Sequence, residues 1–166
     1  NITTRTASIN LAAGENITCK FTNRKNISLS ATKSWAGLAS SETAPKVTLT
    51  LTRSPADTPA FSLGVELDGT AGTACTPAAG APCGYESAPW VVTWLGLPTT
   101  NLAGTTYAYS VSEGTAPAGF TGSPASCTPT ATASACTITN TRTTTSLAAT
   151  KSWAGLASSE TAPKVT

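Results

Sequence analysis

The chain has 166 residues, of which only 11% are charged, and its formal net charge is +2. Such a weak charge excludes the electrostatic footprint of a nucleic-acid-binding protein or of one held at an acidic membrane surface. Histidine is absent, so the commonest metal ligand and general base at neutral pH is missing. We therefore expect no metal site, no cofactor and no conventional enzyme. No apolar run reaches the roughly 18–20 residues of a membrane span.

An internal repeat organises the chain. The stretch ATKSWAGLASSETAPKVT occurs at residues 31–48 and again, letter for letter, at residues 149–166. Upstream of the two copies, TCKFTNRKNISLS is similar to ACTITNTRTTTSLA with one residue inserted, so Cys19 matches Cys136 and Asn23 matches Asn140. Such self-similarity is typical of tandem domains.

The repeat predicts three parts. They are the C-terminal part of a preceding repeat at residues 1–28, a complete repeat at 29–146, and the first strand of a following repeat at 147–166. Both ends of the chain are then expected to be cuts through a longer array, with the partner of Cys19 before residue 1. Neighbouring repeats of the same protein are the expected partners.

Short strands dominate the complete repeat. Apolar and small polar residues alternate with period 2 in runs that Gly-, Pro- and Ser-rich turns separate. In chain order the predicted strands are residues 29–35, 46–53, 89–97, 105–113 and 136–141, and 89–97 is expected to be a largely buried strand that runs into a Gly-Leu-Pro turn. No segment has the 3.6-residue period of a helix, and 11 prolines leave little room for one. We expect an all-β fold, an antiparallel Ig-like β-sandwich.

Three polar residues fall in register with core residues. Lys33 has the parity of its apolar strand neighbours, and so have Glu113 and Asn140 in their own strands. A charge buried alone costs several kcal/mol, so these groups must pair, change protonation state or react. A reactive interpretation is an intramolecular isopeptide bond, in which a neutral lysine amine attacks the asparagine carboxamide and a buried carboxyl group moves the protons. Equally compatible with parity alone is an exposed Lys33–Glu113 ion pair, with Asn140 in a turn.

Four of the five cysteines form two close pairs. Cys75 and Cys83, and Cys127 and Cys136, each enclose a short Pro-, Ala- and Thr-rich loop. The spacing favours two disulfides and therefore an exported protein. Zinc binding is the weaker interpretation because no histidine completes a ligand set, and free buried thiols are the third.

Several motifs together resemble the collagen-adhesin B-type (CnaB) domain, also described as the SpaA-like prealbumin fold of bacterial pilins and surface adhesins. The motifs are ATKSW, APKVTLTLTR, WVVTWLGLP, YAYSVSEGTAPAGF and CTITNT, in the order that the family has. The resemblance implies that Lys33 is the nucleophile of an isopeptide bond, Asn140 the acceptor and Glu113 the catalytic carboxyl. It also implies that Asn23 and Lys151 are the equivalent residues of the flanking repeats, without partners in this segment.

The leading functional hypothesis is structural. We expect a repeat of an extracellular bacterial surface stalk, adhesin or fibre, stabilised by the Lys33–Asn140 bond and by disulfides. One alternative is a ligand-binding adhesin module that uses the longer loops around residues 58–85, and another is a subunit of a self-assembling filament. Glu66 and Asp68 could form a carboxylate pair, but the sequence DGT at 68–70 favours a turn.

Overall fold

The structure is a computed structural model that describes residues 8–19, 23–78, 81–144, 149–151, 153–154 and 161. Within these residues, secondary structure lies between Asn26 and Arg142 and consists almost entirely of strands. The strands are β1 (Asn26–Ala36), β2 (Val47–Ser54), β3 (Ser62–Leu67), β4 (Cys83–Ala88), β5 (Val91–Pro98), β6 (Ala108–Glu113), β7 (Phe120–Ser123), β8 (Ser126–Cys127) and β9 (Thr137–Arg142). A single 3₁₀ turn, η1 (Ala133–Ala135), precedes β9. None of the described residues belongs to a helix that is long and apolar enough to cross a membrane.

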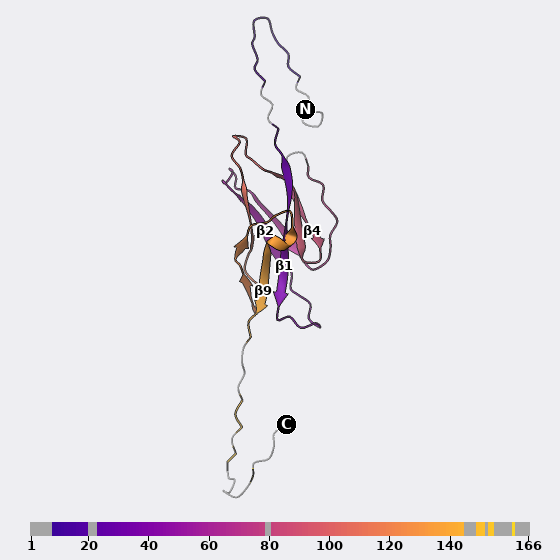
Figure 1. The fold of residues 1–166 in the computed structure, drawn as a ribbon, viewed down its shortest axis with the longest axis vertical. Coiled ribbons are helices and arrows are strands. Elements are labelled where there is room, and N and C mark those ends of the chain that lie inside the picture. The colour runs from indigo at the N-terminus through magenta and orange to yellow at the C-terminus, as the bar shows by residue number, and fades with distance from the viewer. Residues whose placement is uncertain are drawn as a thin grey trace.

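The strands form two sheets that pack face to face as a β-sandwich (Figure 1). One sheet has five strands in the order β4-β5-β1-β9-β7, and the other has four in the order β3-β2-β6-β8. The all-β, Ig-like fold expected from the alternating sequence pattern is therefore confirmed.

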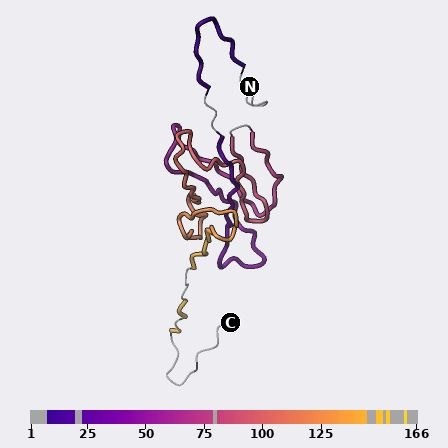
Figure 2. The backbone as a smooth tube through the Cα atoms, turned by 45° about the horizontal axis from the view of Figure 1, so that its top comes forward, coloured from indigo at the N-terminus to yellow at the C-terminus, as the bar shows by residue number. Residues whose placement is uncertain are grey.

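The first and last strands lie side by side in the centre of the larger sheet. β1 and β9 pair in parallel, and they are the one parallel pair among the described strands. In Figure 1 both arrows point the same way, so the chain enters the sandwich at one end and leaves it at the other. We call the end where Asn26 starts β1 the N pole, and the end where Arg142 finishes β9 the C pole. The same arrangement is visible in the rotated view of Figure 2.

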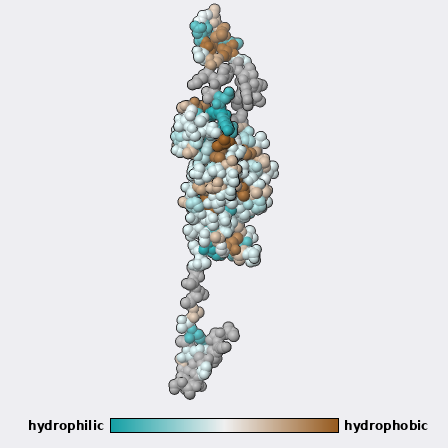
Figure 3. Space-filling view, viewed as in Figure 1, coloured by the Kyte–Doolittle hydropathy of each residue, from teal (hydrophilic) through white to brown (hydrophobic). Residues whose placement is uncertain are grey.

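The core lies between the sheets and is built from the inward-facing residue of each alternating pair. Its fully buried large apolar residues are Leu49, Leu51, Leu67, Val92, Trp94, Leu97, Val111 and Ile138. Trp94 takes the space above Gly84, where an added Cβ would lie 2.5 Å from the indole ring. Burial of this apolar surface is the main favourable contribution to the free energy of folding. The outer surface carries few strongly hydrophobic or hydrophilic side chains on the face that Figure 3 shows.

Two strands lie in a segment where longer loops were expected. Residues 58–85 contain β3 and the start of β4. Gly64 interrupts the alternation of β3, and β4 begins inside a stretch rich in Pro, Ala and Gly, so neither strand has a clean period-2 signal. In the described part of this segment no large hydrophobic side chain is exposed.

Both predicted disulfides are present. Cys75 bonds to Cys83 and ties the loop after β3 to the first residue of β4. Cys127 bonds to Cys136 and joins β8 to the residue that precedes β9. Cys19 is exposed and makes no disulfide within the described residues. The two bonds confirm the pairing predicted from the cysteine spacing and exclude free thiols at these four positions.

Candidate functional site

The structure brings Lys33, Glu113 and Asn140 together inside the sandwich. The side chains of Lys33 and Glu113 are 0% and 6% exposed, and Asn140 is fully buried. The Lys33 ammonium Nζ lies 3.4 Å from Glu113 Oε2, and Asn140 Nδ2 donates a hydrogen bond of 2.8 Å to Glu113 Oε1. The carboxylate therefore bridges the amine and the carboxamide. An exposed ion pair, the alternative that strand parity left open, does not describe this geometry.

Strand pairing explains why these three side chains meet. In the parallel β1–β9 pair, Lys33 lies opposite Ile138, two residues before Asn140 on the same face. Glu113 is the last residue of β6 in the opposite sheet, where it pairs with Leu49 of β2. The site thus spans the gap between the two sheets, close to the C pole.

Lys33 donates two hydrogen bonds in addition to its ion-pair contact with Glu113. Besides Glu113, its Nζ donates to the backbone carbonyl oxygens of Ser34 at 3.1 Å and Ile138 at 3.2 Å. Burial lowers the pKa of Lys33 below its usual 10.5, and the nearby Glu113 carboxylate offsets part of that shift. Desolvation is the larger cause, so the neutral amine is more accessible here than on an exposed lysine.

Asn140 fits its position because the neighbouring strand carries a glycine. Gly122 of β7 pairs directly with Asn140, and a Cβ added to it would lie 2.9 Å from Asn140 Oδ1 and 3.6 Å from Glu113 Oε2. Two buried oxygens in the site, Asn140 Oδ1 and Glu113 Oε2, have no hydrogen-bond partner among the residues that the structure describes. Buried polar atoms are normally paired, so this arrangement holds unused hydrogen-bonding capacity at the carboxamide and the carboxylate.

An aromatic wall covers the lysine. The Trp35 ring lies 4.6 Å from Lys33 Nζ, and Trp90 and Phe120 pack edge-on against Trp35 at 5.4 and 5.1 Å between ring centroids. The carbonyl oxygen of Trp90 also accepts the backbone N–H of Lys33 at 2.8 Å. These rings lie over the amine, and its burial favours the uncharged form of the lysine.

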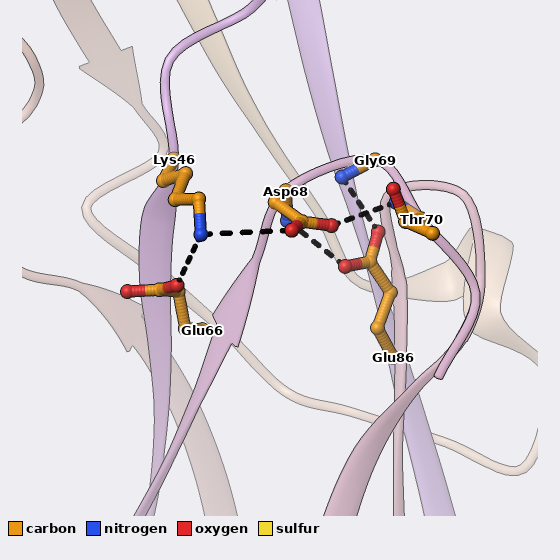
Figure 4. Close-up of polar contacts among 6 residues, drawn as sticks. All are labelled: Lys46, Glu66, Asp68, Gly69, Thr70 and Glu86. Atoms are coloured by element: carbon orange, nitrogen blue, oxygen red, sulfur yellow. Dashed lines mark hydrogen bonds and ion pairs between the residues drawn. The ribbon is translucent and has the colours of Figure 1, made fainter. Parts of the chain in front are cut away.

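Sequence reasoning missed Glu86, whose carboxylate holds Trp90 in place. Glu86 is 5% exposed and accepts three backbone N–H groups: from Asp68 at 2.9 Å, from Gly69 at 3.0 Å and from Trp90 at 2.7 Å. Figure 4 shows the carboxylate reaching under the turn at 68–70. Trp90 has a φ of 63°, a strained conformation for a large residue. The sequence offered no signal for this role, because the strand that carries Glu86 has no clear alternation and the donors are backbone groups.

The other predicted residues lie outside this constellation. Asn23 and Lys151 are exposed, unlike the buried Lys33 and Asn140. Glu66 and Asp68 both bind the exposed Lys46, at 3.0 and 3.6 Å, and Asp68 accepts the backbone N–H of Thr70 (Figure 4). This is a surface ion-pair group beside a turn, as the DGT sequence indicated. The described residues contain no group of three or more potential metal ligands.

We expect Lys33 to titrate at lower pH than Lys46 in an Asn140→Ala variant, in which the lysine amine has no carboxamide to react with. Burial lowers the pKa of Lys33, whereas its carboxylate neighbours raise the pKa of Lys46. The side-chain nitrogen chemical shifts, followed by NMR against pH, measure both.

The same shift has a consequence for stability in that variant. Since the folded-state pKa of Lys33 lies below its unfolded value of 10.5, the folded state loses the proton first as the pH rises. Between the two pKa values the unfolded state binds more protons, so the free energy of unfolding increases with pH. Equal pKa values for the two lysines would contradict the assigned burial.

Glu86→Gln should lower the free energy of unfolding by about 1.5–3 kcal/mol, because a charged acceptor of three buried N–H groups becomes neutral and one oxygen becomes an N–H₂ donor. Glu66→Gln, which removes a carboxylate that is 62% exposed, is the matched control and should change it by less than about 0.5 kcal/mol. Urea unfolding measures both, and equal effects would show that Glu86 does not anchor the turn.

A comparison with protein families places these observations in context. The model of the Cna protein B-type domain matches residues 29–141, which include all three site residues and both disulfides. No curated protein and no solved structure gives a significant match. Domains of this family are structural modules of bacterial surface proteins rather than enzymes. Since the match covers more than half of the sequence, the chain belongs to the Cna protein B-type domain family.

Proposed function

We propose that this chain is a tension-bearing repeat of an extracellular bacterial surface stalk or fibre, locked by an autocatalytic isopeptide bond between Lys33 and Asn140. The observation that carries the proposal is the buried arrangement in which the Glu113 carboxylate touches both the Lys33 amine and the Asn140 carboxamide. Two disulfides support an oxidising, extracellular setting.

The first chemical step is a proton transfer within the ion pair. The proton passes from the Lys33 ammonium to the Glu113 carboxylate, whose Oε2 lies 3.4 Å from Nζ, so that two buried charges become two neutral groups. Desolvation of the buried lysine favours this exchange because it penalises the charge on the ammonium group. The amine then has a free electron pair, and the carboxyl group has a proton to donate.

The carboxamide must then present its oxygen to that proton. In the structure Asn140 donates through Nδ2 to Glu113, as suits an ionised carboxylate. Rotation of the amide by 180° about its terminal bond exchanges the positions of Nδ2 and Oδ1, and a protonated Glu113 then donates to the carbonyl oxygen. This hydrogen bond draws electrons from Asn140 Cγ and stabilises the negative charge that develops on oxygen.

Attack and elimination complete the reaction. The Lys33 nitrogen forms a bond to Asn140 Cγ, and the tetrahedral intermediate expels the Asn140 nitrogen as ammonia. Glu113 carries a proton from the attacking nitrogen to the leaving one. The ammonia takes up the remaining proton and leaves as ammonium, so the products are one amide bond, ammonium and the Glu113 carboxylate. No water, metal or cofactor takes part in the balance.

The position of the bond suits a protein under tension. Force that enters at Asn26 and leaves at Arg142 pulls β1 and β9 in opposite directions past each other. A bond from Lys33 to Asn140 carries that force directly across, and the chain from residue 34 to 139 bears none of it. Closing a loop of this length also removes about 4–5 kcal/mol of unfolded-state entropy, by analogy with a disulfide.

The intact chain should weigh about 17 Da less than its sequence after allowance for disulfides, because one ammonia is lost when the bond forms. Lys33→Met, Glu113→Gln and Asn140→Ala should each abolish the loss. The exposed pair offers the matched controls, Lys46→Met and Glu66→Gln, which should retain it. Intact-mass spectrometry of folded protein, with circular dichroism to confirm the strand content of each variant, decides; a full sequence mass in the unaltered chain would refute the bond.

Gly122→Ala should slow the ammonia loss by about tenfold or more while leaving the β-sandwich intact, because the new methyl group displaces the Asn140 carboxamide from its place beside Glu113. Gly114→Ala, next to Glu113 but with open space around its Cβ, is the control and should react at the normal rate. Mass spectra taken at intervals during cell-free synthesis give the rates. Equal rates for the two variants would show that the carboxamide position is not limiting.

A further inference from the structure

The repeat pattern leaves almost no linker between consecutive domains. Lys151 matches Lys33, so the first strand of the following copy starts at Thr144 if it begins where β1 does, at Asn26. β9 ends at Arg142, which leaves one residue between the two strands. At about 3.3 Å per extended residue, the C pole of one repeat and the N pole of the next must lie against each other. This step depends on the tandem array of the proposed function.

The N pole contacts Arg24 and Lys25, which the repeat pattern assigns to the preceding copy. Thr99 donates from its backbone N–H, at 3.0 Å, to the carbonyl oxygen of Lys25. Arg24 Nη1 donates to the carbonyl oxygen of Thr100 at 3.4 Å. The turn that follows β5 is therefore attached to the last residues of the preceding copy.

A pocket of about 420 Å³ opens beside this turn. It is lined by Arg24, Arg53, Asp57, Asn101, Leu102, Ala103 and Tyr107. Arg53 and Tyr107 are fixed by Asp57, which binds the guanidinium Nε and the phenol oxygen, each at 2.6 Å. Leu102 is 76% exposed and is the one large apolar side chain exposed among the described residues of the sandwich. These polar side chains and the exposed leucine lie beside the turn that Arg24 and Lys25 contact.

The C pole presents a loop at the same junction. Arg142 donates from Nε to the carbonyl oxygen of Gly37 at 3.1 Å and from Nη2 to Glu42 Oε2 at 2.7 Å. The last residue of β9 thus holds the loop at 37–46, whose sequence is repeated unchanged in the second copy.

Arg24 and Arg142 are the same position in two successive repeats. Arg24 lies nine residues before Lys33, and Arg142 lies nine residues before the matching Lys151. Arg24 shows what this arginine contacts in the repeat that follows it, and Arg142 shows what it contacts in the repeat that precedes it. One arginine therefore adjoins both the loop at 37–46 of one copy and the pocket of the next.

We propose that consecutive repeats dock end to end, with the loop at 37–46 of each repeat seated against Leu102 and the N-pole pocket of the next, around this shared arginine. The occupant of the pocket is a second copy of the same repeat, and the array is a stiff rod rather than a string of freely rotating domains. By default, domains joined without a large interface move relative to one another, so stiffness is a distinguishing outcome.

The chain itself supplies the test protein. Residues 149–166 duplicate 31–48, so appending residues 49–143 after Thr166 completes a second repeat with the native junction. ¹⁵N relaxation should give one rotational correlation time for both repeats, about twofold longer than for the original chain. Leu102→Ser in the second copy faces the junction and should shorten it toward the value for independent repeats. The same substitution in the first copy faces away from the junction and is the matched control, expected to change nothing.

Two results would overturn the proposal: independent tumbling of the unaltered two-repeat protein, or equal effects of the two leucine substitutions. Intact mass, read on the same sample, keeps the crosslink separate. A loss of two ammonia molecules with independent tumbling refutes docking alone, and joint tumbling without that loss refutes the crosslink alone.

Discussion

The structure depends on how a lysine charge is kept inside a β-sandwich. Lys33 is fully buried, and the free-energy cost of its desolvation is offset by a carboxylate from the opposite sheet and by two backbone carbonyl oxygens. An ion pair in this position is a weak source of stability, and well-packed apolar residues would serve at least as well. The crosslink proposed above would remove the lysine charge and leave the Glu113 carboxylate.

Several features elsewhere in the fold keep the three groups in place. Gly122 leaves room for the carboxamide, and the Trp35, Trp90 and Phe120 rings exclude water from the amine. Glu86 in turn fixes Trp90 through its backbone N–H, although it lies in another strand and contacts none of the three groups. The site is therefore preorganised by packing and backbone geometry as much as by its own hydrogen bonds.

The sequence predicted the parts of this structure that follow from alternation. The parity of β1, β6 and β9 placed Lys33, Glu113 and Asn140 on core faces, and cysteine spacing predicted both disulfides. The roles of Glu86 and Gly122 could not be foreseen, because each depends on a backbone or a carboxamide that is distant in sequence. The parallel pairing of β1 with β9 could not be predicted either, because the alternation of residues along a strand does not indicate which strand lies next to it.

The location of the disulfides has a consequence for the redox response of an array. Cys75–Cys83 and Cys127–Cys136 both lie within the chain between residues 34 and 139. With Lys33 joined to Asn140, tension along the array would pass through the crosslink. The segment between residues 34 and 139 would bear none of it. Thiol reductants would then loosen the packing of each domain and increase its exposure to proteases, while the end-to-end length of the loaded fibre stayed constant. In such a crosslinked array, the cohesion of each domain and the extension of the fibre would be governed by different covalent bonds.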